Sequence, residues 1–215
     1  MEIESAESAE SAESAPVESG DTSRLLIDVA IRHLSLYGWE GTQLPAIVDE
    51  VHVAKSSVYH FFGSREGLLA AATAEQYRRT LLAEDARVVD DARSCETEEE
   101  FLSFLERELL RVATDPVTIA ARKERVIIAA AALSRDELAA DVASAQQVFV
   151  DAMAEIICDA QQRGLINSAV NPTSYASWLH GMTLGRTLTA SSCSDPLNWL
   201  AVAVPAALAP LRLES

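Results

Sequence analysis

Residues 42–61 read TQLPAIVDEVHVAKSSVYHF, a stretch with the spacing of a helix-turn-helix. It predicts one helix of about eight residues, a tight turn near His52 and a second, shorter helix. The apolar side chains that would pack the two helices against each other are Ile47, Val51, Val53, Val58 and Phe61. The shorter helix therefore keeps a face that is not needed for this packing.

The other side chains of the shorter helix are polar or amphipathic: Lys55, Ser56, Ser57, Tyr59 and His60. Such a helix can lie in the major groove of DNA with its N-terminal residues at the base edges. Serine hydroxyls bond donors or acceptors on the bases, and lysine bonds guanine or a phosphate. Tyr59 and His60 could reach phosphate oxygens, which fix position rather than sequence. The spacing alone also fits a plain helical bundle.

The rest of the chain predicts an all-α fold of about nine helices, because capping residues recur and no segment alternates as a strand does. The expected helix starts are Thr22 or Ser23, Thr42, Lys55, Ser64, Thr97, Asp115, Ser134, Asn171 and Asp195. Two of these residues form capping boxes, Thr97 with Glu100 and Ser134 with Glu137. The first helix should end at Gly38, and the fourth should run past Tyr77 as far as Ala92. The long helix that Ser134 opens should end at Arg163-Gly164.

Charge and repetition set the N-terminus apart. Residues 4–15 repeat Glu-Ser-Ala four times, and residues 1–20 hold six of the chain's 33 acidic side chains and none of its 17 basic ones. We expect a disordered acidic tail over residues 1–20, which either aids solubility or competes with DNA for a basic surface. A DNA-binding domain would follow over 21–70, and a larger ligand-binding and dimerisation domain over 71–215.

The remaining composition narrows the class of protein. The formal net charge is −16, which by itself argues against nucleic acid as a partner. Cys95, Cys158 and Cys193 are scattered, so we expect reduced thiols, no metal and a cytoplasmic protein. No apolar run is long enough to span a membrane. No catalytic triad or carboxylate pair has a suggestive spacing, so we expect neither an enzyme nor a cofactor; a small all-α enzyme is the weakest alternative.

A longer stretch makes the DNA-binding hypothesis specific. Residues 25–69, LLIDVAIRHLSLYGWEGTQLPAIVDEVHVAKSSVYHFFGSREGLL, resemble the N-terminal DNA-binding domain of the tetracycline-repressor (TetR) family. The matching landmarks, at family spacing and without a gap, are Ala30, Gly38-Trp39, Thr42, Ile47, Val53, Lys55, Tyr59, Phe61, Ser64, Arg65, Glu66 and Leu68. The C-terminal part matches the family only in its general plan of helices.

The resemblance implies roles for individual residues. Thr42 would cap the second helix and touch a backbone phosphate, and Ser64 and Arg65 would hold a phosphate at the start of the fourth helix. Lys55, Ser56, Ser57, Tyr59 and His60 would form the recognition helix. The chain departs from the family pattern at several positions: His52 stands where the family usually has Gly, Ala54 stands where it usually has a Ser or Thr cap, and Val48 stands where it often has Ala.

A dimer contact is expected near the C-terminus. Ser177, Gly181 and Gly185, with Leu188 one turn on, form a stripe of mostly small residues at i, i+4 spacing, and Trp199 lies on the apolar last helix. The resemblance implies a four-helix bundle made by the last two helices of each subunit. A tight crossing within one subunit is the alternative.

The signal for a ligand pocket is weaker. The large apolar residues on the helices expected to enclose one are Phe101, Phe104, Phe149, Met153, Trp178 and Met182. Of Arg122, Lys123 and Arg125, one arginine turned inward could fix an anionic ligand. We expect His180 to be a hydrogen-bonded core or interface residue.

These expectations combine into one hypothesis. The protein would be a homodimeric, ligand-responsive transcriptional regulator, a repressor released from a palindromic DNA operator by a small-molecule effector. The alternative is a dimeric small-molecule-binding protein whose degenerate helix-turn-helix no longer binds DNA.

Overall fold

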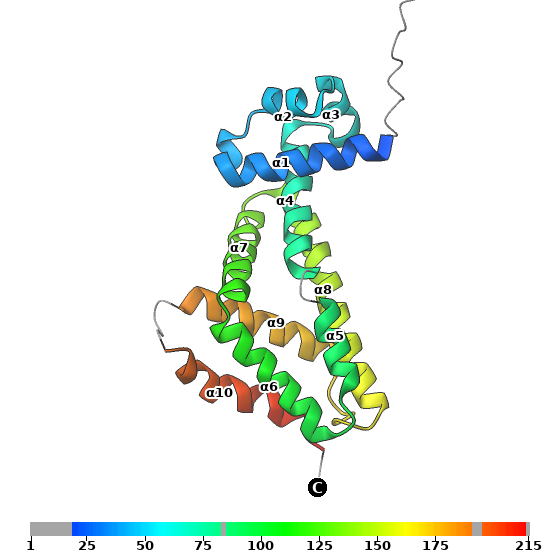
Figure 1. Cartoon of the computed structure of the whole chain (residues 1–215), viewed down its shortest axis with the longest axis vertical. Helices are drawn as coiled ribbons and strands as arrows, with labels where there is room; N and C mark the ends of the chain where they lie inside the picture. Colours follow the sequence, from blue (N-terminus) through cyan, green and yellow to red (C-terminus); the bar gives the residue numbers. More distant parts are fainter. Residues whose placement is uncertain (1–18, 83–84, 191–194, 214–215) are drawn as a thin grey trace, which may run out of the picture.

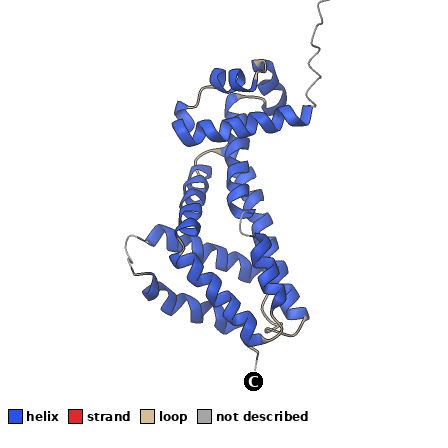
Figure 2. Ribbon diagram, in the orientation of Figure 1, coloured by secondary structure: helices blue, strands red, loops and turns tan. Residues whose placement is uncertain are grey.

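The computed structural model describes residues 19–82, 85–190 and 195–213. These residues form helices and loops without a strand (Figure 2), as the sequence predicts. The helices are α1 (Ser19–Gly41), α2 (Leu44–Val51), α3 (Lys55–Phe62), α4 (Arg65–Leu82), α5 (Asp85–Ser94), α6 (Glu98–Thr114), α7 (Pro116–Ala132), α8 (Asp136–Gln162), α9 (Pro172–Thr189) and α10 (Pro196–Leu208), with a 3₁₀ turn over Ala209–Leu211. Residues 1–18 of the predicted acidic tail lie outside the described residues.

Most of the predicted helix starts are confirmed by hydrogen bonds. Thr97 accepts from the Glu100 amide at 3.2 Å, and the Glu100 carboxylate accepts from the Thr97 amide, which completes the capping box of α6. Asp115, Asn171 and Asp195 each accept from a backbone amide in the first turn of α7, α9 and α10. A side-chain acceptor at these positions satisfies an amide that the helix itself cannot.

Four predicted boundaries are wrong. Helix α1 begins at Ser19, so Thr22 and Ser23 lie inside it and neither is its cap. Helix α2 is preceded by Gln43 rather than by Thr42, whose hydroxyl donates to the carbonyl of Gly38 instead. Ser134 does not cap α8, because its hydroxyl returns to the preceding helix and donates to Ala131 O. The fourth helix stops at Leu82, and α5 is a separate helix, so the described residues contain ten α-helices instead of about nine.

The molecule has a small and a large helical part (Figure 1). Helices α1, α2 and α3 lie together at one end, where they pack against the start of α4. Their shared core consists of Leu26, Val29, Ala30, Leu44, Ile47, Val48, Val58, Leu68, Leu69 and Ala72. Gly38 interrupts α1 with φ 67° and ψ −179°, so the predicted break at this glycine is confirmed.

Helix α4 connects the two parts. It runs from the small part down between α7 and α8 (Figure 1), and Tyr77 and Leu81 of α4 are buried against Ile128 of α7 and Leu138 of α8. The far end of the large part contains α6, α9 and α10, which pack with the C-terminal half of α8. Any shift of α7 or α8 therefore reaches α4 through packed side chains.

Candidate DNA-binding surface and ligand cavity

The turn between α2 and α3 is built on His52. His52 has φ 57° and ψ 44°, which makes it the one non-glycine residue with a positive φ in the described part of the chain. His52 therefore adopts the left-handed conformation that is expected at a position where the TetR family usually has Gly. Ala54 precedes α3 with extended dihedrals and no side-chain hydrogen bond, so the missing cap is confirmed as well. The loss of a cap costs about 1 kcal/mol of stability.

Helix α3 is anchored by one side chain and exposes most of the others. Val58 is fully buried in the small core. Lys55, Ser56, Tyr59 and His60 are exposed and Ser57 is half-buried, so the five residues of the expected recognition helix lie on or near the surface. Tyr59 is 57% exposed, whereas the His60 ring packs edge-on against Phe61 with 4.9 Å between centroids.

The turn into α4 brings two backbones close together. The hydroxyl of Ser64 accepts from the Gly67 amide at 2.9 Å, which is an N-terminal cap of α4. A Cβ on Gly67 would lie 2.1 Å from the Phe62 carbonyl oxygen, so only glycine fits there. The Ser64 cap and the close approach of Gly67 to Phe62 therefore fix the angle between α3 and α4 and hold α3 in place.

Thr42 and Arg65, which were expected to contact the DNA backbone, donate hydrogen bonds to carbonyl oxygens of the protein itself. Thr42 is fully buried, and its hydroxyl donates to Gly38 O at 2.7 Å, so it presents no surface to a phosphate in this conformation. The Arg65 guanidinium donates to the carbonyls of Trp39 at 2.6 Å and Thr42 at 2.8 Å. Arg65 therefore ties the end of α1 to the start of α4, and its charge is already bound to backbone oxygens.

An acidic side chain pairs with two further basic groups of the small part. Arg32 and His33 of α1 contact Glu50 of α2 at 2.5 and 2.8 Å. These bonds, from His33 first and Arg32 second, lower the pKa of Glu50 below its ordinary value. Few positive charges of the small part remain for DNA phosphates as a result.

The large part contains a cavity of about 100 Å³ among α6, α7, α8 and α9. Of the apolar residues expected to enclose a ligand, Phe104, Phe149 and Met153 line it. Phe101, Trp178 and Met182 are not lining residues. Phe101 is buried in the adjacent core, Trp178 is 44% exposed beside Tyr175, and Met182 packs near Leu109 and Leu200.

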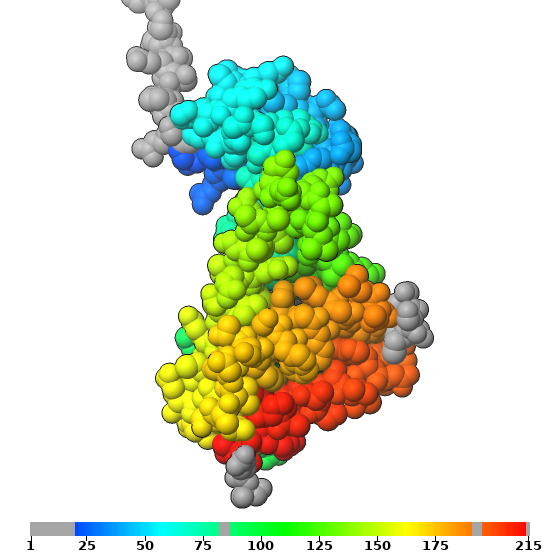
Figure 3. All heavy atoms as spheres, turned by 180° about the vertical axis from the view of Figure 1, so that it is seen from behind, coloured from blue at the N-terminus to red at the C-terminus, as the bar shows by residue number. Residues whose placement is uncertain are grey.

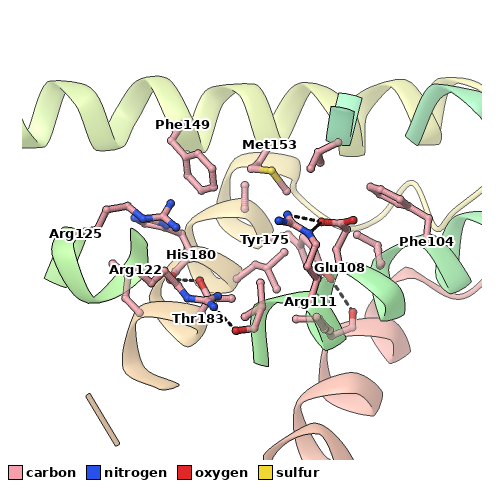
Figure 4. Close-up of a pocket in the computed structure, with 18 residues that line it drawn as sticks. Phe104, Glu108, Arg111, Arg122, Arg125, Phe149, Met153, Tyr175, His180 and Thr183 are labelled. Carbon is pink, nitrogen blue, oxygen red and sulfur yellow. Dashed lines mark hydrogen bonds and ion pairs between the residues drawn. The ribbon is translucent and has the colours of Figure 1, made fainter. Parts of the chain in front are cut away.

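Two arginines of α7 reach this cavity (Figure 4). Arg122 and Arg125 both line it with only 3% and 5% of their surface exposed, whereas Lys123 is exposed to solvent. They share a helix face with buried Thr118, Ile128 and Ala132. That placement, in phase with the apolar stripe, is the signal in the sequence that would have identified both arginines.

Other polar groups of the cavity were missed by the sequence analysis. Glu108 and Arg111 of α6 form an ion pair at 2.7 Å, and Glu108 also pairs with Arg87 at 2.9 Å. Thr183 lines the wall, and Tyr175 donates its hydroxyl to Ala207 O at 2.9 Å. Isolated polar residues on long helices give no periodic pattern, so sequence alone could not bring them together.

His180 also lines the cavity, and its ring lies 4.9 Å from that of Phe149. Its Nε2 is buried and has no hydrogen-bond partner among the described residues, so the prediction of a hydrogen-bonded core histidine is wrong. Burial first, and the positive charge of Arg125 second, lower the pKa of His180 to about 4. The imidazole is therefore uncharged at neutral pH, and the charge of Arg125 places it in a positive electrostatic potential.

Helices α9 and α10 lie side by side on the face seen in Figure 3. Of the residues expected at a dimer contact, Ser177, Gly181 and Leu188 are exposed, and Gly185 and Trp199 are half-buried. A Cβ added to Gly181 or Gly185 would meet no atom of the described chain within 4 Å. No close crossing within the described subunit therefore explains these two glycines.

The described residues offer few other kinds of site. Within the described ranges, no group of three or more His, Cys, Asp or Glu side chains is arranged to hold a metal ion. None of the described helices combines the length and apolar character needed to cross a membrane. Cys95 and Cys158 are free thiols, and Cys193 lies outside the described residues.

Comparisons with known proteins extend the resemblance. Residues 26–72 match the family described as "Bacterial regulatory proteins, tetR family". The solved structures that are similar include a TetR-family transcriptional regulator from Mesorhizobium loti, with 19% identity, a TM-score of 0.66 and coverage of 92% of this chain and 100% of that one. A TetR-family regulator from Cytophaga hutchinsonii has 16% identity, a TM-score of 0.60 and coverage of 94% and 100%. Reduced NemR of E. coli has 18% identity, a TM-score of 0.58 and coverage of 91% and 99%. No curated protein matches the chain significantly.

Proposed function

We propose that this chain, whose residues 26–72 belong to the tetR family of bacterial regulatory proteins, is a homodimeric transcriptional repressor in the cytoplasm. Residues 21–70 would bind a palindromic operator. Residues 71–215 would form the dimer and bind a small-molecule effector that releases the DNA. The protein would act by binding alone, without enzymatic activity.

One observation carries the DNA-binding half of the proposal. Helix α3 is fixed from behind by Val58, by the His52 turn and by the Ser64 cap, yet it exposes Lys55, Ser56 and Tyr59. A rigid helix with a polar outer face is what readout in the major groove requires. In a dimer, two copies of α3 would enter successive major grooves roughly 34–36 Å apart.

Contacts around α4 support coupling between the cavity and α3. Gln76 of α4 bonds Glu124 of α7, and the Tyr77 hydroxyl accepts from Gln146 of α8 at 3.1 Å. Arg135, between α7 and α8, lies 4.8 Å over the ring of Trp39 in α1. A ligand that displaces α7 or α8 would pull on α4 through these contacts and change the spacing of the two α3 helices. Coupling of this kind is reciprocal, so ligand and DNA must weaken each other equally.

A specific observation favours the alternative of a ligand-binding protein without DNA affinity. Ala54 provides no cap, Arg65 is bound to carbonyls, and Arg32 is paired with Glu50. These features reduce the charge available for phosphates and the stability of α3.

Selection from a library of random DNA duplexes separates the two candidates. The proposal predicts enrichment of a two-fold symmetric sequence whose half-sites lie about 10 bp apart, or a multiple of it. The Ser56→Ala variant should relax base preference at one position of each half-site, whereas Ser103→Ala, on α6, should leave the selected sequence unchanged. Recovery of no motif by a folded dimer would establish the alternative.

A further inference from the structure

The cavity among α6, α7, α8 and α9 offers a ligand a mostly apolar wall. Phe104 and Leu105 of α6, Phe149 and Met153 of α8 and Leu179 of α9 are among the residues that line it. Aromatic rings and a thioether are surfaces against which a flat aromatic ring packs well. The wall therefore favours a ligand with a small aromatic body.

The charged side chains of the lining interact with other groups of the protein. Glu108 and Arg111 form an ion pair at 2.7 Å. Arg122 donates to the carbonyl of Val112, and Arg125 also interacts within the chain. These charges do not require a charged ligand, and an ion would have to lose its hydration to enter the cavity. A ligand without charge avoids that cost.

His180 gives the same cavity a polar atom that a ligand can satisfy. Its Nε2 is buried and bonds no group of the described chain, and its ring lies 4.9 Å from that of Phe149. A buried polar atom without a partner is unfavourable, so a ligand that supplies the partner gains affinity. Burial first, and Arg125 second, lower the pKa of His180 to about 4, so the ring is uncharged at neutral pH. An uncharged imidazole has one N–H and one lone pair, and a hydroxyl group can bond either of them.

We propose that the effector is a small uncharged phenol, whose ring packs against Phe149 and Met153 and whose hydroxyl bonds His180 Nε2. Figure 4 shows Phe149 and Met153 extending from α8 into the cavity, on whose other side α9 carries His180. This inference rests on the proposed function, because it names the ligand class of that ligand-binding site.

The size of the cavity limits the ligand to a single ring. An apolar cavity of about 150 Å³ is known to hold benzene. The cavity here measures about 100 Å³, so it suits a ring of about benzene's size without long substituents. Phenol is the simplest probe of this class, and it is uncharged at pH 7 because a phenolic hydroxyl has a pKa of about 10.

The test is titration calorimetry on the full chain in the absence of DNA, with phenol and with toluene, in which a methyl group replaces the hydroxyl. Phenol should bind at millimolar or lower concentration. In His180→Leu, which removes the bonding nitrogen, the ratio of phenol affinity to toluene affinity should fall by at least about tenfold. A ratio compared between two proteins cancels the difference in hydrophobicity between the two probes. Met153→Leu changes the same wall at nearly constant volume and should retain the ratio.

A second measurement does not depend on the folding of the His180 variant. At pH 7, saturating phenol should shift the ¹⁵N resonance of His180 Nε2 in NMR spectra. Toluene should leave this resonance in place, because it cannot form the hydrogen bond. The other three histidines lie in residues 33–60, in the small part.

The outcomes are distinct from those of the proposed function. Absence of phenol binding at millimolar concentration, an equal ratio in wild type and His180→Leu, or an unmoved Nε2 resonance at saturation would each overturn the inference. Tighter binding of benzoate than of phenol would also overturn it, because the site would then take an anion. Phenol that bonds His180 while no DNA motif is selected would support this inference and refute the repressor, and a selected motif without phenol binding would do the reverse.

Discussion

Replacement of Lys55 by alanine should reduce both the affinity for DNA and its dependence on salt. Of the four basic side chains in residues 21–70, Arg32 contacts Glu50 and Arg65 binds the carbonyls of Trp39 and Thr42. Arg24 and Lys55 are exposed and have no ion pair within the described structure. We therefore count two phosphate-binding cations in each subunit and four in a dimer.

The magnitude follows from counterion release. Four neutralised phosphates give a slope of log K against log [salt] of about −3.6, which corresponds to a loss of about 150-fold in affinity between 50 and 200 mM salt. Lys55→Ala removes two of the four contacts in a dimer, so the slope should fall to about −2 and the loss to about 10-fold.

The assay is fluorescence anisotropy with the selected duplex at several salt concentrations. Lys123→Ala is the matched control, since Lys123 is the chain's other lysine and is exposed on α7, in the large part. An unchanged slope in Lys55→Ala, or the same reduction in Lys123→Ala, would refute the reasoning that α3 meets the phosphates through this residue.

Three other predictions concern stability and assembly. Ala54→Ser should supply the missing cap of α3 and raise the melting temperature by about 2–4 °C, for a gain near 1 kcal/mol; circular dichroism that shows no increase would contradict the capping argument. The pKa of Glu50 is lowered in the folded protein by His33 and Arg32, so this carboxylate stabilises the fold above its ordinary pKa of 4.5, and the contribution disappears as the pH falls through the lowered value. Urea unfolding measures this contribution as the difference in the free energy of unfolding between pH 6 and pH 3.5. That difference should be smaller in Glu50→Gln than in the wild type, and an equal difference in the two proteins would exclude the effect. Gly181→Leu should leave the helical spectrum unchanged, because a Cβ there meets no described atom, but should give a monomer in sedimentation velocity; an intact dimer would exclude this face.

The helix-turn-helix could be predicted because local chemistry and packing agree there. The apolar spacing of Ile47, Val58 and Phe61 matches the observed core or its edge, and His52 adopts the left-handed turn that its position demanded. Caps that consist of an acceptor followed by proline, as at Asp115, Asn171 and Asp195, were also correct. Each of these signals is confined to a few adjacent residues.

The errors arose where a side chain had two possible partners. The hydroxyls of Thr42 and Ser134 can accept from a following amide or donate to a preceding carbonyl, and both donate backward in the structure. The end of α4 at Leu82 has no glycine or proline nearby to mark it. Sequence patterns do not decide such competitions, because the outcome depends on the packing of the helix ends.

The ligand site was predicted in part, for a related reason. Phe104, Phe149 and Met153 line the cavity, but Phe101, which is equally apolar and lies on the same helix as Phe104, is in the core. Arg122 and Arg125 were considered with Lys123, and only their position on the buried face of α7 distinguishes them. The contact between α7 and the helices around it depends on tertiary packing, which local patterns in a single sequence do not reveal.

Chemical protection of the selected duplex tests most directly whether α3 reads the major groove. Dimethyl sulfate methylates guanine N7 in the major groove and adenine N3 in the minor groove, so it reports the groove that the protein occupies. The account predicts two clusters of protected guanine N7, centred about 10 bp apart or a multiple of it, with adenine N3 still reactive between them. Protection of adenine N3 alone, or a single cluster without a symmetric partner, would contradict it.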